Sequence, residues 1–363
     1  MTRILAACSP GEVRVAAVRG VLLDYMIGRP GCPDGVGDLY RGRVLAHVPA
    51  LAGAFVALPG AEGFLPDSAG GAGATDGMAV QVRVTRAAQG GKGPRLRIDG
   101  VGEPGAPALL ARGPGAVERM ALLHPDAAVI VDDPGHAVEL RRILGVRVSV
   151  GSVLNDDLSG QIEALSATDF PLPGGTRASI HPTPALVAID MDGASASADR
   201  RSKAASQMAM NLQALPELAR HIRLRNLSGA ILVDVAGLAL RRRVALAPAF
   251  MAALADDPLR PRFLGFTAGG LAEITRPRIH PPLHELLSGP HAAGLQALRA
   301  VMQASAATPS DAHALRCPPD MAAALSDDPV ALPDLARRTG RPLVLRPDPT
   351  LAPGRFSVEV CRV

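Results

Sequence analysis

Short apolar stretches separated by glycine-rich turns fill the first hundred residues. Alternating apolar and polar positions predict an initial hairpin with strands at 3–7, 13–18 and 20–25, followed by a Gly- and Pro-rich loop at 29–37. Five more strands are predicted at 43–47, 54–58, 63–65, 79–85 and 95–98. Five short strands in so short a segment are typical of a small barrel of the OB type.

After residue 100 the pattern changes to a mixture of helices and strands. Residues 101–127 are rich in Pro and Gly and predict no regular element. Strands are expected at 128–132, 146–150, 177–181, 185–190 and 230–235, and helices at 136–144, 158–165, 207–225 and 247–255. Pro216 predicts a kink or a restart in the third helix. A small α/β unit follows, with helices at 295–304 and 334–339 and strands at 342–345 and 356–361.

Two strongly apolar runs each end at a carboxylate. Asp190 closes one run, Asp234 closes the other, and Asp192 stands beside the first. A carboxylate in such a place is costly to bury unless it is paired or holds a metal ion. The three residues therefore form a candidate site for Mg²⁺ or Mn²⁺, which prefer hard oxygen ligands.

A simpler interpretation remains open for each of these acids. Asp190 and Asp234 are also compatible with aspartates that cap turns at strand ends, and Asp192 with a solvated loop carboxylate. The pair Asp132-Asp133, which follows another apolar run, is interpreted as such a turn.

The composition is that of a soluble globular protein. The 363 residues suggest two or three domains, and the contents of hydrophobic (48%) and charged (20%) residues are ordinary. Aromatic residues make up only 2%, so the core must be built mainly from Ala, Val, Leu and Ile. The net charge of +4 permits nucleic-acid binding without requiring it. Lys92 and Lys203 are the two lysines, so a lysine at a motif position is informative.

The cysteines indicate a reducing compartment. Cys8, Cys32, Cys317 and Cys361 stand too far apart in sequence for a zinc ribbon or a redox pair. The four residues between Arg3 and Cys8 are too few for the apolar region of a signal peptide. No apolar stretch reaches the length of a membrane span. We therefore expect a cytoplasmic protein with no membrane partner.

Nine short motifs follow one another in order over most of residues 1–285. They are Arg-Gly-Arg-Val at 41–44, Ala-Phe-Val at 54–56, Gly-Phe-Leu-Pro at 63–66, Gly-Lys-Gly-Pro-Arg-Leu at 91–96, Leu-Pro-Gly-Gly at 172–175, Pro-Thr-Pro-Ala-Leu-Val-Ala-Ile-Asp at 182–190, Asn-Leu-Gln-Ala at 211–214, Arg-Leu-Arg-Asn-Leu-Ser-Gly at 223–229 and Gly-Leu-Ala-Glu-Ile-Thr-Arg at 270–276. This ordered set resembles the ribonuclease E/G family of bacterial endoribonucleases.

The resemblance implies an α/β (α+β) fold. Its catalytic domain would have an RNase H-like part and a DNase I-like part, with an OB-fold (S1-type) β-barrel insert in the former and a small C-terminal α/β domain. The boundaries are 1–36 and 128–167 for the RNase H-like part, 37–100 for the RNA-binding insert, 101–127 for a reduced sensor region, 168–285 for the DNase I-like part, 286–294 for a linker and 295–363 for the C-terminal domain.

The resemblance also implies a metal-dependent endoribonuclease of RNA processing or decay. A Mg²⁺-activated water would cleave single-stranded RNA and leave a 5′-phosphate. Asp190 and Asp234 would hold the metal ion, and Asp192 would complete the catalytic group.

The RNA-binding residues follow in the same way. Phe55 and Phe64 would stack on RNA bases and Lys92 would hold the backbone, with barrel core as the alternative for both Phe. Arg200 and Arg201, in a polar loop expected at 193–206, are candidates for phosphate contact, with a solvated loop as the alternative.

The chain departs from the family pattern at several places. The family's Asp-x-Asn reads Asp190-Met191-Asp192, and its Ser-Arg before the Gly-Leu segment reads Thr267-Ala268, so one expected cation is missing. Residues 101–127 are too short for the region that senses the RNA 5′ end. Residues 288–291 stand where paired zinc-binding cysteines are expected.

These departures limit the expected cofactors and partners. We expect Mg²⁺, with Mn²⁺ as a substitute, no zinc, and a monomer or dimer rather than a zinc-linked tetramer. His280 and His284 are rejected as a zinc pair because Pro281 and Pro282 break the helix that would align them. The alternative function is a catalytically weak or inactive RNA-binding protein of the same fold. An Asp-x-Asp glycosyltransferase is disfavoured because no nucleotide-sugar fold pattern accompanies the motif.

Overall fold

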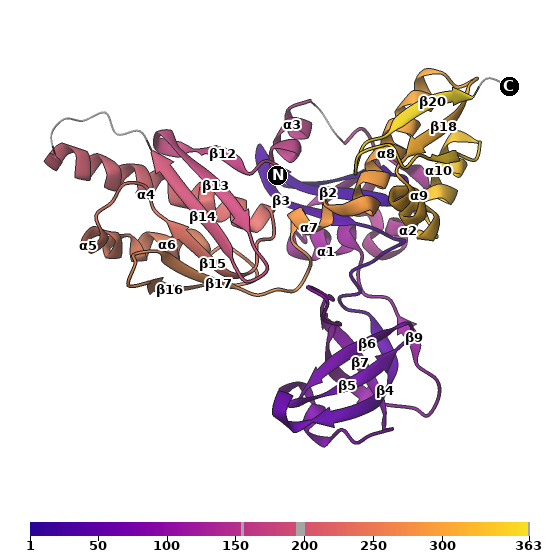
Figure 1. The fold of residues 1–363 in the computed structure, drawn as a ribbon, viewed down its shortest axis with the longest axis horizontal. Helices are drawn as coiled ribbons and strands as arrows, with labels where there is room; N and C mark the ends of the chain where they lie inside the picture. Colours follow the sequence, from indigo (N-terminus) through magenta and orange to yellow (C-terminus); the bar gives the residue numbers. More distant parts are fainter. Residues whose placement is uncertain (154–155, 194–199, 362–363) are drawn as a thin grey trace. The chain divides into compact units, whose positions relative to one another are not determined.

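A computed structural model of the chain describes residues 1–153, 156–193 and 200–361, with the backbone alone for residues 156 and 200–203 (Figure 1). The chain forms two units. The first contains residues 1–35, 114–155 and 283–363, and the second contains residues 36–113 and 156–282. In each unit, segments far apart in sequence come together, because the chain leaves the first unit after residue 35 and returns to it twice.

The first unit contains a five-stranded sheet, here the N-terminal sheet. Its strands are β1 (Arg3–Ser9), β2 (Glu12–Arg19), β3 (Val21–Gly28), β10 (Ala128–Val131) and β11 (Val148–Val150), in the order β11-β10-β1-β2-β3. β1 to β3 form the predicted antiparallel hairpins, whereas β10 runs parallel to β1. Gly11 has a φ of +71° in the β1–β2 turn, a conformation that favours glycine.

Two helices cover this sheet, α1 (Ala116–Leu123) and α2 (Pro134–Leu144). The expectation of no regular element over 101–127 is wrong, because this segment contains α1 and the strand β9 (Ala108–Ala111). Ala116, Val117, Met120 and Ala121 recur at helical spacing and are buried against the sheet. The apolar pattern of this short helix, which lies between Gly- and Pro-rich segments, was too weak to predict α1 from the sequence.

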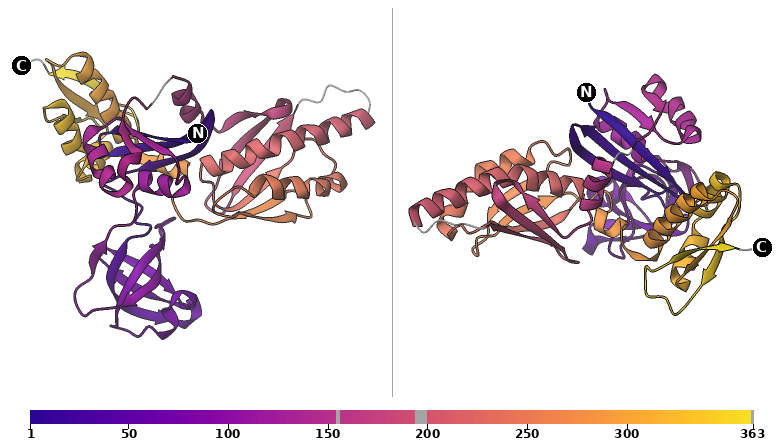
Figure 2. Two further views of the ribbon diagram at one scale, coloured as in Figure 1. Left: turned by 180° about the vertical axis from the view of Figure 1, so that it is seen from behind. Right: turned by 90° about the horizontal axis from the view of Figure 1, so that it is seen from above.

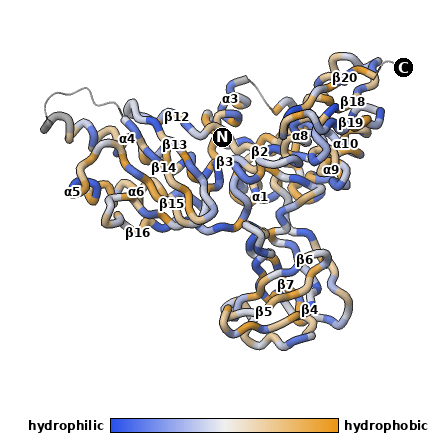
Figure 3. The backbone as a smooth tube through the Cα atoms, viewed as in Figure 1, coloured by the Kyte–Doolittle hydropathy of each residue, from blue (hydrophilic) through white to orange (hydrophobic). Residues whose placement is uncertain are grey.

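Five strands close into a barrel, which confirms the prediction of a small β-barrel in this segment. They are β4 (Leu39–Val48), β5 (Gly53–Leu58), β6 (Ala61–Pro66), β7 (Ala79–Arg86) and β8 (Arg95–Val101). The order β5-β6-β8-β7-β4 closes through a β4–β5 pairing, and β9 pairs with the outer edge of β4. Alternate residues fill a small aliphatic interior that includes Val44, Val56, Leu65, Val82 and Leu96. Figure 3 shows the resulting alternation of hydrophobic and hydrophilic stretches.

The second unit also contains a six-stranded sheet. Its strands are β12 (Asp169–Leu172), β13 (Thr176–Pro182), β14 (Val187–Gly193), β15 (Gly229–Asp234), β16 (Arg262–Phe266) and β17 (Ala272–Arg276), in the order β12-β13-β14-β15-β17-β16. Its helices are α3 (Asp156–Ala164), α4 (Arg200–Leu224), α5 (Leu240–Arg243) and α6 (Ala247–Leu254). β14 and β15 are parallel neighbours, and α4 connects them.

One face of the six-stranded sheet carries the core. Leu215, Leu218 and Ile222 of α4 and Phe250 of α6 pack against the inward residues of the strands. Figure 1 looks onto the strands, and Figure 2 shows α4 lying over the face behind them. A kink or a restart was predicted at Pro216, and the restart does not occur, because α4 runs through Pro216 without interruption.

The C-terminal part of the first unit contains α7 (Leu283–Leu286), α8 (Gly289–Ala307), α9 (Pro319–Asp327) and α10 (Ala331–Thr339). Its sheet has the order β19-β18-β20, with β18 (Ala312–Cys317), β19 (Val344–Pro347) and β20 (Ser357–Cys361). The prediction of a linker at 286–294 is wrong, since α8 begins inside it. Gly289 and Pro290 suggest a break, but proline is well tolerated in the first turn of a helix.

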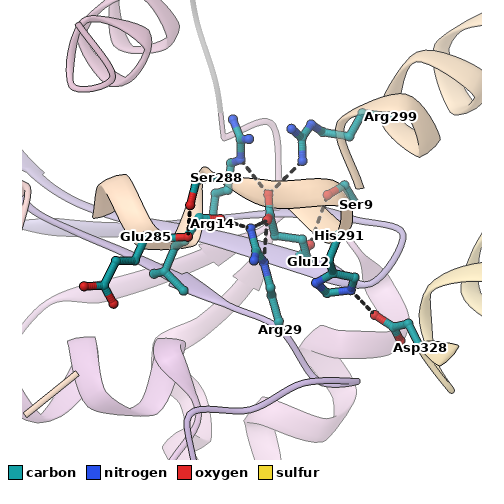
Figure 4. A network of polar contacts seen from close by, with 10 residues as sticks. Ser9, Glu12, Arg14, Arg29, Glu285, Ser288, His291, Arg299 and Asp328 are labelled. Carbon is teal, nitrogen blue, oxygen red and sulfur yellow. Dashed lines mark hydrogen bonds and ion pairs between the residues drawn. The ribbon is translucent and has the colours of Figure 1, made fainter. Parts of the chain in front are cut away.

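A buried carboxylate joins α8 to the N-terminal sheet. Glu12 is 2% exposed, and it accepts hydrogen bonds from Arg14, Arg29 and Arg299 at 2.9, 3.1 and 2.7 Å (Figure 4). Burial raises the pKa of the Glu12 carboxyl, but the three guanidinium charges outweigh it, so its pKa lies below the usual value. Arg29 also donates to the carbonyl of Leu286 at the end of α7.

Within the described ranges, no helix is long and apolar enough to cross a membrane.

Candidate active site

The two predicted metal ligands are direct neighbours across parallel strands. Asp190 of β14 and Asp234 of β15 are register partners. Such partners lie about 4.8 Å apart and point to the same face of a sheet. Ile189 and Val233, one position earlier, are buried in the core, so both aspartates project from the opposite face. Asp190 is exposed, and the Asp234 side chain is 47% exposed.

Asp192 lies in a strand rather than in a loop. β14 continues past Asp190 to Gly193, so the prediction that Asp190 ends its strand is wrong. The continuation is stabilised by β13, where Arg177 lies opposite Asp192 and Thr176 lies opposite Gly193. Since alternate residues of a strand share a face, the open face of the sheet carries Asp190, Asp192 and Asp234. One Asp192 oxygen accepts the N–H of Gly193 at 2.8 Å.

The donor set suits a hard divalent cation. Among the described residues, no three His, Cys, Asp or Glu side chains gather closely enough to hold a metal ion by themselves. Mg²⁺ commonly binds through one or two carboxylates and keeps several waters. Two in-register carboxylates on an open face fit that form of coordination. They do not fit a closed zinc site, which needs about four ligands.

Arg243 belongs to this site, and the sequence analysis did not identify it. It is the last residue of α5, and its Nη1 donates to an oxygen of Asp234 at 2.5 Å. Nη1 also donates to the carbonyl of Gly270 at 3.0 Å, and Nε donates to the carbonyl of Leu238 at 3.0 Å. The only sequence signal is the run of three arginines at 241–243, which does not distinguish this one.

Asn211 holds the segment that follows Asp234. This fully buried residue of α4 donates to the carbonyl of Ala236 at 2.9 Å and accepts the N–H of Ala236 at 3.1 Å. It also donates to the carbonyl of Gln207 at 2.7 Å. The Asn211 amide therefore makes the same pair of hydrogen bonds with the Ala236 backbone that a neighbouring strand would make. This pairing fixes the direction of the chain after β15.

The motifs at 223–229 and 270–276 meet in a buried polar cluster. Arg276 donates to Asp257 at 2.7 Å and to the side chain of Asn226 at 2.7 Å. Asn226 has a φ of +48°, and its side chain donates to the carbonyl of His280 at 3.0 Å. Arg276 and Asp257 are 3% and 6% exposed, so this cluster holds the end of the sheet in place and is closed to a ligand.

The two phenylalanines of the barrel lie on its outer surface. Phe55 of β5 and Phe64 of β6 are register partners, and their ring centroids are 5.5 Å apart in an edge-to-face arrangement. Both are half-buried, whereas their neighbours Ala54 and Leu65 are fully buried. The structure therefore excludes the interpretation of the pair as barrel core. Gly53 leaves room for the Phe64 ring, since a Cβ there would come within 2.4 Å of it.

Lys92 lies in the hairpin turn that leads into β8. Its backbone pairs with Gln89 across Gly90 and Gly91, whose φ angles of +57° and +73° match a two-residue turn of type I′. The Lys92 side chain is exposed.

The strand that follows this turn runs beside the aromatic pair. The N–H of Phe64 donates to Pro94 at 2.9 Å, and Phe64 pairs with Arg95 in register. Arg95 is exposed, and sequence reasoning missed it.

Two predicted RNA-binding residues cannot be placed. The side chains of Arg200 and Arg201 lie outside the described residues. The expected polar loop at 193–206 is wrong in its second half, because α4 begins at Arg200. In the segment at 288–291, His291 pairs with Asp328 at 2.8 Å.

Comparison with known proteins gives a family match that covers the six-stranded sheet. Residues 152–279 match the model of the ribonuclease E/G family. Ribonuclease E of Nostoc sp. is 37% identical over 118 residues, which cover 32% of this chain and 17% of that protein. Ribonuclease E of Escherichia coli is 33% identical over 131 residues, covering 35% and 12%. A chloroplastic ribonuclease E/G-like protein of Arabidopsis thaliana is 31% identical over 145 residues, covering 38% and 14%. The matched stretches thus span less than a fifth of each relative.

Proposed function

We propose that the chain is a metal-dependent endoribonuclease of the ribonuclease E/G family, whose model matches residues 152–279. It cleaves single-stranded RNA and leaves a 5′-phosphate on the downstream product. The observation that carries the proposal is the register of Asp190 with Asp234, which brings two available carboxylates together on an open sheet face. The proposed role of the protein is in RNA processing or decay.

The residues of the site have separate tasks in the proposed reaction. Asp190 and Asp234 hold Mg²⁺, with Mn²⁺ as a substitute. When bound, the ion offsets charge on the phosphodiester and lowers the pKa of a coordinated water. Asp192 adds a third negative charge on the same face. The open face admits an extended RNA strand, because the helices α4 and α6 lie on the other side.

The barrel is proposed as the RNA-binding part, an OB fold of the S1 type. Phe55 and Phe64 present an aromatic surface on which bases can stack, and each base stacked on an aromatic side chain contributes about 1–3 kcal/mol. Lys92 adds a positive charge near this pair, and Arg95 adds another beside Phe64. Neutralising phosphates with such charges makes binding depend on salt.

The division into domains is part of the same proposal. The N-terminal sheet has three antiparallel strands followed by two parallel ones, an order that supports an RNase H-like part interrupted by the barrel. The six-stranded sheet is proposed as the DNase I-like part. With only β9 and α1 between residues 101 and 127, we infer that the 5′-end sensor is reduced. RNAs with a 5′-monophosphate or a 5′-hydroxyl should then be cleaved at similar rates.

The proposal extends to the compartment, the metal content and the oligomeric state of the protein. We infer a cytoplasmic enzyme without zinc that is a monomer or a dimer. The alternative of an inactive RNA-binding protein is not favoured, because the two carboxylates face each other in register and are available.

A cleavage assay tests the proposed function. The full-length protein is incubated with end-labelled single-stranded RNA in Mg²⁺ or in EDTA. We expect internal cleavage with Mg²⁺ alone, and a downstream product that a 5′-phosphate-dependent exonuclease degrades. RNA binding without cleavage under these conditions would instead establish the inactive alternative.

A further inference from the structure

The two partners of the ion pair between Arg243 and Asp234 differ in their exposure to solvent. The Arg243 side chain is 16% exposed, whereas the carboxylate it contacts is 47% exposed. The cation is thus fixed behind the acid, and the acid faces solvent. An ion pair with an exposed partner contributes little to stability. The contribution of this ion pair to stability therefore does not explain why a guanidinium group lies beside Asp234.

Three acceptors fix the guanidinium. The carbonyls of Leu238 and Gly270 come from the segment after β15 and from the β16–β17 hairpin, and the third acceptor is an oxygen of Asp234. Because two of these acceptors belong to the backbone, it is the Asp234 side chain whose orientation Arg243 restricts. Among the described contacts, none involves the second oxygen, Oδ2, which stays available to a ligand.

The hairpin is shaped to accept Arg243. Gly270 has a φ of +86°, and a Cβ there would lie 2.2 Å from the side chain of Leu240 and 3.2 Å from Cδ of Arg243. The same hairpin carries Ala268, where the family pattern has an arginine. The cation missing from the hairpin has a counterpart in Arg243 of α5, which contacts the Gly270 carbonyl of that hairpin and Asp234.

We propose that Arg243 is the positioning residue of the carboxylate pair, and that it supplies from α5 the positive charge that Ala268 does not. This inference rests on the proposed function. Arg243 holds one oxygen of Asp234 in place and partly offsets the charge of three neighbouring aspartates. The residue acts through Asp234 rather than on the RNA.

The test compares three variants. Arg243→Gln removes the charge, and Arg243→Lys keeps it but lacks the planar fork that reaches several acceptors. Arg242→Gln is the matched control, because it removes the same charge from the adjacent, exposed position on α5. Mn²⁺ binding to RNA-free protein is measured by calorimetry, and melting temperatures are recorded. Cleavage rates are measured over a range of RNA concentrations at saturating Mn²⁺, which gives kcat and KM.

In Arg243→Gln, we expect turnover to decrease and the affinity for Mn²⁺ to increase. Its kcat should fall about 10–100-fold, with KM unchanged, as for other residues that orient a metal ligand. Its Kd for Mn²⁺ should fall about threefold, because a positive charge beside the site is gone. Arg243→Lys should keep the wild-type Mn²⁺ affinity and recover part of kcat, and Arg242→Gln should match wild type. Adding Ala268→Arg to Arg243→Gln should restore part of kcat.

Other results would overturn the inference. A raised KM with unchanged kcat would show that Arg243 contacts RNA directly. Weaker Mn²⁺ binding together with a lower melting temperature would show a merely structural role, and failure of Ala268→Arg to restore turnover would refute the equivalence of the two positions. If wild-type protein neither binds Mn²⁺ nor cleaves RNA, the proposed function itself fails, and the inference with it.

Discussion

The N-terminal sheet and the six-stranded sheet each place an aspartate at the end of a strand that runs parallel to its neighbour. In the N-terminal sheet, Asp132 follows β10 and accepts the N–H of Cys8 from β1 at 2.8 Å. The next residue, Asp133, accepts the N–H of His136 at 2.7 Å at the start of α2 and pairs with Arg338 at 2.9 Å. These acids are engaged by the fold.

In the six-stranded sheet the corresponding acids are available. Asp190 makes no hydrogen bond or ion pair within the part of the chain that the structure describes, and Asp234 is held by Arg243 through one oxygen. The two sequences look alike, an apolar run followed by aspartate. The difference teaches that a carboxylate after an apolar run indicates a site only when the surrounding structure leaves at least one of its oxygens without a partner.

The largest effect is expected when the available acids of the six-stranded sheet are neutralised. Asp190→Asn and Asp234→Asn should each lower kcat at least ~100-fold, about 2.7 kcal/mol in activation free energy, because each removes a charged metal ligand. The melting temperature should stay unchanged, since neither carboxylate is buried. Asp132→Asn is the control and should cleave RNA at the wild-type rate. Unchanged cleavage in Asp190→Asn would remove the proposed site.

The converse test neutralises an acid that the fold engages. Glu12→Gln should lower the free energy of unfolding by about 3–5 kcal/mol, because it leaves three arginines around a neutral group. Denaturant unfolding measures this loss, while cleavage per folded molecule at 25 °C should be retained. Glu139→Gln, an exposed substitution in the same unit, should cost almost nothing. A destabilisation below about 1 kcal/mol in Glu12→Gln would contradict a structural role of this size.

The same contrast applies to the phenylalanines. Phe55→Ala and Phe64→Ala should weaken RNA binding by about 1–3 kcal/mol with little change in stability. Phe250, whose ring stacks on Phe263 at 5.1 Å in the core, is the matched control. Phe250→Ala should cost about 3–5 kcal/mol in stability. Fluorescence anisotropy with labelled RNA and thermal unfolding separate the two effects. Unaltered RNA affinity in both barrel variants would refute the stacking surface.

The smallest expected effect concerns Asp133 and pH. Burial raises the pKa of its carboxyl, but the His136 N–H and the charges of Arg338 and Arg337 outweigh burial, so the native pKa is lowered. A lowered native pKa adds stability that is complete above the ordinary value of about 3.9 and is lost as pH falls through the native pKa. Asp133→Ala should remove about 1 kcal/mol at pH 7, since it also deletes the helix cap.

Asp133→Asn separates the two contributions of that residue. Asparagine keeps the cap and removes the charge, so this variant should lose less stability than Asp133→Ala at pH 7. The free energies of unfolding of Asp133→Asn and wild type should become equal as the pH is lowered toward 3. A pH-independent difference between Asp133→Asn and wild type would show that the ion pair with Arg338 contributes nothing.

Much of the fold was predictable where the signal is local. The initial hairpins, the barrel strands and the strands around Asp190 and Asp234 follow from alternation and glycine turns, and all are present. β12, β16, β17, β18 and α9 were not predicted. Two further errors occur where local composition suggests a break and packing decides otherwise. α1 forms in a Gly- and Pro-rich segment because Met120 and its neighbours are buried, and α8 begins at Gly289 within a predicted linker.

The sequence by itself predicted the α/β fold class and the three aspartates of the site. The apolar runs before Asp190 and Asp234 and the glycine turns are local features. The surface position of Phe55 and Phe64 was decided by the barrel. Tertiary structure alone decided the register of β14 with β15, the extension of β14 through Asp192, and the contact of Arg243 with Asp234. The physical reason is distance along the chain. A 25-residue helix separates the two strands, so their alignment depends on how α4 packs on the sheet.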